Sequence, residues 1–247
     1  MNQDSPNPQA PSSEPSPRRR LWAWALYDWG NSAFATTVMA GFFPVFFGAY
    51  WGAGNAPALT TFRLGLANSV ASMVIVLLAP LLGAVADAGR TRKRWLAGLS
   101  GLGVLATGAL AFIGMGEWAL AAMAYVIGCI GFLGANVFYD SLLVAAAPEA
   151  EHDRASSLGY ALGYLGGGLL FALNVAMAKM PHRFGLPDAT AAVKVGFLSV
   201  AVWWALFTVP LLRWVPEPEG GRAQGLWSAT VEGLAQLRDT LQHVRQL

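Results

Sequence analysis

Six long apolar runs constrain the fold of this chain more than any other feature of its sequence. They cover about 22–48, 64–86, 95–115, 118–145, 158–178 and 192–213. A transmembrane α-helix needs roughly 20 apolar residues, and each run reaches that length. Lipid admits only helices or closed barrels, and the runs lack the alternating pattern of membrane β-strands. The sequence therefore predicts an all-α membrane protein with six transmembrane helices.

The composition agrees with a membrane protein and argues against a nucleic-acid partner. Of 247 residues, 55% are hydrophobic and 12% are charged, whereas soluble domains carry about 25% charged residues. The net charge is only +2, and the basic residues lie in short loops rather than along one face. The partners that we expect are membrane lipids and a small-molecule solute, and no nucleic acid.

The distribution of Lys and Arg predicts the orientation of the bundle. If the N-terminus lies inside, twelve of these residues fall on inner segments and four on outer segments. By the positive-inside rule, this excess places both termini in the cytoplasm, with the bundle in the cell (inner) membrane. The inner set is Arg18, Arg19, Arg20, Arg90, Arg92, Lys93, Arg94, Arg154, Arg213, Arg222, Arg238 and Arg245.

The chain divides into four parts by composition and periodicity. Residues 1–20 are polar, rich in proline and basic at their end, which predicts a disordered basic cytoplasmic tail. Residues 21–213 form the six-span bundle, and residues 214–225 form a linker interrupted by Pro216 and Pro218. In residues 226–247 apolar side chains recur every three or four positions, which predicts an amphipathic helix at the membrane interface.

Two of the spans are expected to depart from straight, upright helices. The first run is too long to stand upright, so we expect a tilt, or a bend near Gly41 and Pro44. Pro80 is expected to kink the second span, where neighbouring helices would satisfy the freed backbone groups.

Polar residues inside the first run mark a candidate site. Asp28 and Asn31 lie one helical turn apart in the stretch Tyr27-Asp28-Trp29-Gly30-Asn31-Ser32-Ala33-Phe34. An ionisable group at membrane depth costs a few kcal/mol or more unless it faces a bundle interior or a wet cavity. Such a group is by default a hypothesis for a functional site.

The inner loop between the second and third spans is a second candidate, for gating. Asp87 stands beside the cations Arg90, Arg92 and Lys93, and Gly83 lies four residues before it. Charge-assisted hydrogen bonds here would lock adjacent helices, and a glycine would let the helices approach closely. The alternative is that the basic residues only set the topology.

This loop resembles the major facilitator signature between spans two and three, a glycine followed by an aspartate and a basic cluster. Ala88 stands where the family usually has a basic residue, and Arg90 where it usually has glycine. Two longer stretches, residues 27–34 and Leu158 to Gly168, resemble the vacuolar amino-acid effluxer-like branch, also called the unknown major facilitator group. The resemblance implies twelve spans, of which this chain would hold the N-terminal six, and amino-acid export in the fungal members.

In this family the six spans of a half form an inverted three-plus-three repeat, so spans one and four should be equivalent. Both carry a tyrosine–aspartate pair, Tyr27-Asp28 and Tyr139-Asp140, at a depth of about 10 Å from the inner end. Asn31 and Asn136 each lie one turn from the nearby aspartate and share its face. First and fourth spans line the cavity in this fold, so we expect a polar ring near its cytoplasmic end.

Two roles remain open for the substrate- or proton-binding candidates Tyr27, Asp28, Asn31, Asn136, Tyr139 and Asp140. The carboxylates could bind the amino group of a substrate or carry a coupling proton, or they could be structural and bond helix ends. A third set, Gly159, Gly163 and Gly167, repeats at four-residue steps and is typical of tight helix packing.

The sequence shows no nucleophile–base pair, no cofactor motif and no metal-ligand spacing among its three histidines. We therefore expect no catalytic residues, no cofactor and no metal, and treat an enzyme as the least favoured class. The first hypothesis is a secondary active transporter of a small polar solute by alternating access. The alternative is a truncated or split half that does not transport until it pairs with a C-terminal six-span half or a second copy.

Overall fold

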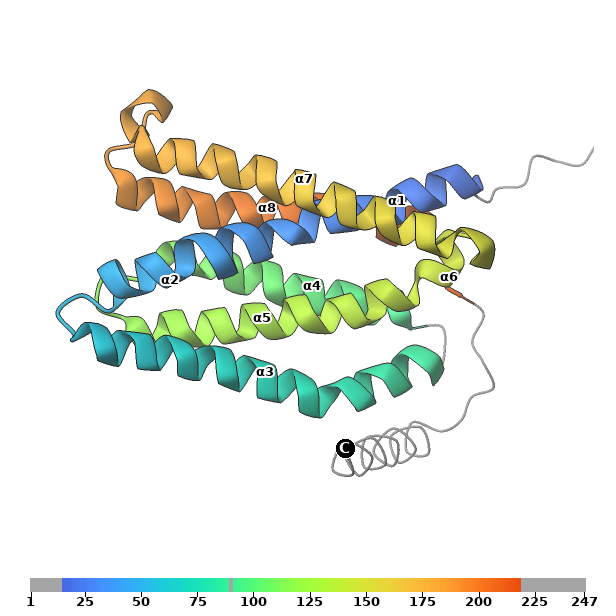
Figure 1. Cartoon of the computed structure of the whole chain (residues 1–247), viewed down its shortest axis with the longest axis horizontal. Helices are drawn as coiled ribbons and strands as arrows, with labels where there is room; N and C mark the ends of the chain where they lie inside the picture. Colours follow the sequence, from blue (N-terminus) through green and yellow to red (C-terminus); the bar gives the residue numbers. More distant parts are fainter. Residues whose placement is uncertain (1–14, 89–90, 219–247) are drawn as a thin grey trace, which may run out of the picture.

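The computed structural model describes residues 15–88 and 91–218, in which long helices run side by side (Figure 1). The long helices are α1 (Pro17–Ala33), α3 (Pro57–Ala88), α4 (Arg92–Ala109), α5 (Trp118–Ser141), α7 (His152–Lys179) and α8 (Ala189–Trp214). Short helical segments are α2 (Phe43–Phe46), α6 (Leu143–Ala146) and 3₁₀ turns at Leu110–Phe112, Glu149–Glu151 and Pro181–Phe184. The predicted interfacial helix, residues 226–247, lies outside the described residues.

The predicted fold class is confirmed. Six helices of the described chain are long and apolar enough to cross a membrane, and its described residues contain no strand. The first of these helices begins earlier than the apolar run, at Pro17, so the basic residues Arg18 to Arg20 form its first turns. Ser16 caps the helix by accepting a hydrogen bond from the backbone N–H of Arg19, and proline is favoured at the first helical position.

The first span is continuous but irregular from Pro17 to Trp51. After α1, π-helical turns occupy Phe34–Phe42, α2 follows, and further π-helical turns run over Phe47–Trp51. This irregular region includes Gly41 and Pro44, around which we predicted a bend. Wider turns of this kind are rare and concentrate at functional sites. In the second span, Pro80 lies inside α3, which bends along its course (Figure 1).

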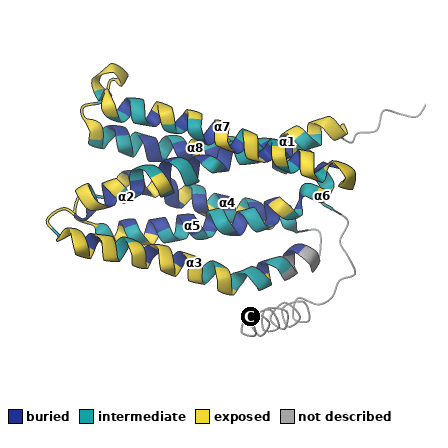
Figure 2. Cartoon of the chain, viewed as in Figure 1, coloured by how far each residue is buried: buried dark blue, intermediate teal, exposed yellow. Residues whose placement is uncertain are grey.

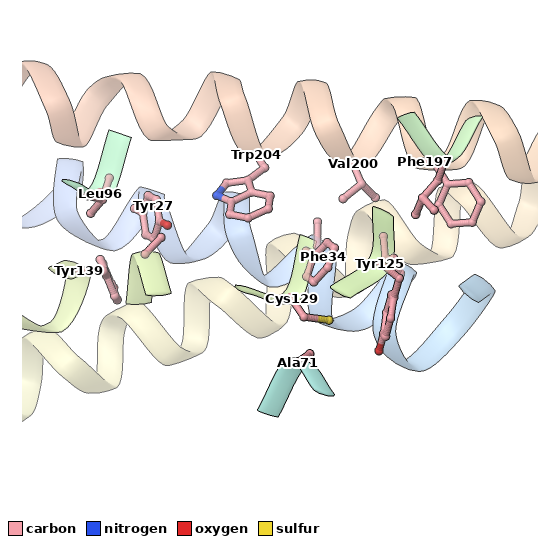
Figure 3. Packing of buried hydrophobic residues seen from close by; sticks show 14 of the residues in the cluster. Tyr27, Phe34, Ala71, Leu96, Tyr125, Cys129, Tyr139, Phe197, Val200 and Trp204 are labelled. Carbon is pink, nitrogen blue, oxygen red and sulfur yellow. The ribbon is translucent and has the colours of Figure 1, made fainter. Parts of the chain in front are cut away.

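Large aromatic side chains from the first span, α5 and α8 fill the core of the bundle. Phe34 packs between Phe132 and Trp204, with ring centroids 5.3 and 5.7 Å away, and Figure 3 shows Phe34 beneath Trp204. Trp204 fits because Gly103 on α4 leaves room, since a Cβ there would collide with the indole ring. The core is therefore built from large rings set against glycines.

Burial is uneven among the helices. Only 11% of the most apolar window of α3 is buried inside the bundle, against 33–39% for the other five spans. Figure 2 shows the exposed residues along α3 and the outer face of α7, whereas α1, α4, α5 and α8 carry most of the buried ones. In a membrane protein such apolar faces meet lipid or another helical unit.

Both described ends of the chain lie at the same end of the bundle. The guanidinium of Arg19 lies 4.2 Å from the ring centroid of Trp214, at the end of α8. The ammonium of Lys93, at the start of α4, donates to the carbonyl of Val215 at 2.8 Å. An even number of spans places both described ends on the same side of the membrane, as the positive-inside count assumed. We refer to this end of the bundle, where Arg19, Lys93 and Val215 lie, as the loop end.

Candidate functional site

A cavity of about 310 Å³ opens between α1, α5 and α7. We call it the polar cavity, because carboxylate, amide and hydroxyl groups line it among aromatic rings. Its lining consists of Asp28, Ser32, Ala35, Thr36, Phe132, Asn136, Tyr139, Asp140, Tyr160, Gly163 and Tyr164.

The α1 wall carries a polar stripe on successive turns. Asp28 accepts a hydrogen bond on Oδ1 from the hydroxyl of Ser32, one turn later, at 3.1 Å. The hydroxyl of Thr36, a further turn on, donates to the carbonyls of Ser32 at 3.1 Å and of Gly167 at 3.2 Å. The stripe thus leads from the carboxylate to the first π-helical turns of the span.

The α5 wall supplies the second carboxylate and is tied to α1. The amide of Asn31 donates to Oδ1 of Asn136 at 2.6 Å, which joins the two helices. The ring of Tyr139 stacks on Trp24 with centroids 4.4 Å apart, and the Trp24 indole N–H donates to the Tyr139 carbonyl at 3.0 Å. These contacts hold α5 so that the neighbouring Asp140 opens to the cavity.

The predicted packing glycines let α7 approach as the third wall, and Gly163 is the one of them that lines the cavity. A Cβ at Gly163 would lie 2.6 Å from the hydroxyl oxygen of Ser32, and one at Gly167 would lie 3.0 Å from the Ser32 carbonyl oxygen. A Cβ at Gly159 would lie 2.9 Å from the hydroxyl oxygen of Tyr139. Only glycine lets α7 come this close to the cavity walls.

The structure divides the six predicted binding residues into two groups. Asp28, Asn136, Tyr139 and Asp140 line the polar cavity, whereas Tyr27 and Asn31 do not. Tyr27 is fully buried and shares a hydrogen bond of 2.9 Å with Ser100 of α4. Asn31 is buried behind the wall, where it holds Asn136.

Sequence reasoning missed two aromatic residues of the cavity. Tyr160 and Tyr164 lie one turn apart on α7, with ring centroids 6.3 Å apart, and are 68% and 73% exposed. Both belong to the glycine-rich stretch that carries the family resemblance. Each of the two tyrosines directly follows a packing glycine, and they are four residues apart, so they lie together beside the glycine face. This spacing is the sequence signal that could have identified them as cavity residues.

The lining contains two carboxylates and no Lys, Arg or His. Asp28 on α1 and Asp140 on α5 face this cavity from two different walls. Among the described residues there is no group of three or more His, Cys, Asp or Glu side chains that could hold a metal ion. The chemistry offered by the cavity is therefore binding of a cationic or hydrogen-bonding group, or of a proton.

In the predicted gating loop, Arg92 at the start of α4 contacts the ends of two other helices, α3 and α5. Its guanidinium donates to the carbonyl of Ala86 near the end of α3 through Nε, and to the carbonyl of Ser141 at the end of α5 through Nη1, at 2.9 Å. The side chain of Asp87 and all of Arg90 lie outside the described part of the chain. Their predicted role in the loop stays a prediction.

Lys93 and a residue that we had not singled out, Glu217, extend this contact to α8. The Glu217 carboxylate accepts from the backbone N–H of Arg92 at 2.6 Å and of Lys93 at 3.3 Å. A carboxylate at a helix N-terminus satisfies unpaired donors and opposes the positive end of the helix dipole. The loop end of α8 is thereby fastened to the start of α4.

One expectation for the loop finds no support among the described residues. We expected Gly83 to allow a close helix approach, but a Cβ at this position would meet no atom within 4 Å. The reason is the position of α3 at the edge of the bundle, where this part of the helix has no described neighbour on the side of Gly83.

Comparison with known proteins adds independent evidence. Residues 16–247 match the family model described as vacuole effluxer Atg22 like. The chain is 35% identical over 195 residues to an uncharacterized MFS-type transporter, YxiO, of Bacillus subtilis, which covers 78% of this chain and 46% of that protein. An uncharacterized protein of Aquifex aeolicus is 28% identical over 188 residues, covering 75% of this chain and 45% of that protein. No solved structure matches, and the chain spans about half the length of the curated relatives it matches.

Proposed function

We propose a transport function from one premise: the chain belongs to the vacuole effluxer Atg22-like family of major facilitator-type membrane proteins. The family predicted from residues 27–34 and 158–168 is thereby confirmed, and the chain is an integral membrane protein. Our proposal is that it forms the solute-binding part of a secondary active transporter. The solute would be small and polar and would cross by alternating access, with amino-acid efflux as the first activity to test.

The observation that carries the proposal is the convergence of Asp28 and Asp140 on one cavity. A charged side chain within a transmembrane bundle costs about 3 kcal/mol by insertion measurements. Two such residues on different helices, both directed to a shared cavity, are difficult to explain by packing alone. Intramembrane carboxylates of this kind mark substrate and proton pathways.

In this proposal each wall of the polar cavity has a separate task. Asp28 and Asp140 bind the solute or the coupling proton, and Asn136 and Ser32 supply hydrogen bonds. Movement of α1 and α5 relative to their neighbours would open the cavity to alternate sides, as in transporters built from repeats. The contacts of Arg92 with α3 and α5 at the loop end would form and break in that cycle.

The proposal is tested by transport into lipid vesicles that contain the purified chain. A panel of radiolabelled amino acids, with and without an imposed pH gradient, should include at least one solute whose flux exceeds that of empty vesicles. Asp28→Asn and Asp140→Asn should each reduce this flux at least tenfold. Asp153→Asn, a matched change on an exposed residue outside the cavity, should leave it intact. Equal flux in all three variants would reject the assigned role of the carboxylates.

A second candidate is a half-transporter that binds solute but transports only with a six-span partner or a second copy. Two observations favour it: the chain spans about half the length of its relatives, and α3 exposes large apolar side chains such as Phe62, Met73 and Leu77. Co-expression with a six-span C-terminal half of a relative should then restore flux that the chain alone lacks. Full flux from vesicles containing only monomers of this chain would reject the half-transporter.

A further inference from the structure

The charge of the polar cavity is unbalanced. Its lining carries two carboxylates, and the described residues place no basic side chain on it. Two cations of the loop end, Arg92 and Lys93, donate to backbone carbonyls and do not line the cavity. Any solute held in the cavity therefore meets negative charge without a compensating protein cation.

Two polar groups of α5 in this cavity lack hydrogen-bond partners among the described residues. The hydroxyl of Tyr139 has no partner, although the residue is only 5% exposed. The carboxylate of Asp140 lies on the same wall and accepts no hydrogen bond from the described chain, whereas Asp28 is partly satisfied by Ser32. The Tyr139 hydroxyl is enclosed and out of reach of a ligand, whereas Asp140 is exposed at the cavity, where its carboxylate is open to pair with a cation.

The aromatic rings of the cavity provide a second means of binding an ammonium group. Tyr160 and Tyr164 are largely exposed on α7, while Phe132 and Tyr139 line the other side. An ammonium group placed within about 6 Å of an aromatic ring is attracted by its negative face. Aromatic cages that recognise quaternary ammonium ligands use this attraction.

From these observations we infer that the polar cavity selects solutes of net positive charge, organic amines whose ammonium group lies between Asp140 and the rings of Tyr160 and Tyr164. A neutral amino acid brings its own carboxylate toward Asp28 and Asp140 and loses part of the attraction. This inference deepens the proposed transport function and depends on it for its physiological meaning. The binding preference itself is measurable without transport.

Three ligands with the same apolar tail isolate the effect of charge. They are 3-methylbutylamine, which is cationic, leucine, which is zwitterionic, and 4-methylpentanoate, which is anionic. Their affinities for the full chain in lipid nanodiscs are measured by isothermal titration calorimetry at pH 7. The amine should bind at least tenfold more tightly than leucine, and the acid should not bind detectably. Equal or tighter binding of leucine or of the acid would overturn the inference.

Substitutions then locate the recognition. Asp140→Asn should weaken binding of the amine at least tenfold, and Tyr160→Leu with Tyr164→Leu should weaken it at least threefold. The matched pair Tyr160→Phe and Tyr164→Phe should retain binding, because the ring face and not the hydroxyl attracts the cation. A thermal melt of each variant checks folding. If the folded Asp140→Asn variant binds the amine as tightly as the parent chain, the inference is wrong.

The outcomes separate this inference from the transport proposal. Absence of flux with a retained preference for the amine rejects transport by the chain alone and supports the inference. Flux of neutral or anionic solutes, together with no preference for the amine, supports transport and rejects the inference.

Discussion

The helices α1 and α7 pack closely where Asp28 meets Gly163, so the side chain at one position limits the side chain at the other. The Asp28 side chain occupies space that α7 leaves free because position 163 carries no Cβ. A Cβ there would lie 3.1 Å from Asp28 Cγ as well as 2.6 Å from the Ser32 hydroxyl oxygen. One glycine therefore serves helix packing and the shape of the polar cavity together, so the packing and functional explanations of this residue are compatible.

This dependence predicts opposite results for two alanine substitutions on the same helix. Gly163→Ala should reduce stability by about 1–3 kcal/mol, the usual cost of overpacking. Gly168→Ala should be neutral or stabilising by up to about 1 kcal/mol, because a Cβ there meets no atom within 4 Å and alanine favours a helix. Unfolding of both variants in mixed detergent micelles measures the difference. Equal stability of the two variants would contradict the close approach of α7.

The Asn31–Asn136 bond predicts a second effect at this scale. Asn31→Leu should leave Asn136 without its partner and weaken the contact of α1 with α5, lowering stability by about 0.6–2 kcal/mol. Solute binding should weaken as well, because Asn136 lines the cavity. The same unfolding assay and the calorimetric titration check both effects, and unchanged binding with lower stability would restrict Asn31 to a structural role.

At the scale of whole elements, the loop end is where four helices are fastened together. Arg92 reaches α3 and α5, Lys93 reaches the end of α8, and Glu217 caps the start of α4. Most of these bonds end on backbone carbonyls or N–H groups at helix termini. They therefore depend on the relative positions of the helices and must rearrange whenever those positions change.

Removal of the cap should therefore loosen this end. Glu217→Gln removes the charge that faces the N-terminus of α4 and should destabilise the protein by about 0.5–2 kcal/mol. Hydrogen exchange of the backbone amides of Arg92 and Lys93 should accelerate, which mass spectrometry detects. Glu149→Gln, on an exposed residue of a short 3₁₀ turn, serves as the control and should change neither quantity. Unchanged exchange in Glu217→Gln would argue that the cap does not hold the helix end.

At the scale of the whole molecule, the excess of Lys and Arg on one set of loops predicts that the loop end faces the cytoplasm. In a variant without Cys129, a cysteine introduced by His182→Cys should react with a membrane-impermeant maleimide added to intact cells. His182 lies at the end of the bundle opposite the loop end. A cysteine introduced by Glu149→Cys, at the loop end itself, should react only after the cells are opened. The reverse pattern of labelling would invert the topology.

The sequence by itself determined the class of the molecule. Six apolar runs of sufficient length can form only membrane-spanning helices, because lipid leaves no other way to satisfy the backbone. The repeated tyrosine–aspartate pair, together with the inverted repeat that the family resemblance implied, predicted that Asp28 and Asp140 line one cavity, as they do. Length and hydropathy are properties of the chain alone, so the fold class could be predicted without knowing how the helices pack.

Only the tertiary structure decided which polar side chains face the cavity. Tyr27 and Asn31 lie within one turn of Asp28, yet they turn toward α4 and α5, whereas Tyr160 and Tyr164 face the cavity. Glu217 finds its partners more than a hundred residues earlier in the chain. Whether a helical side chain faces the cavity or a neighbouring helix depends on which helix packs beside it. That arrangement is set by the packing of the whole bundle.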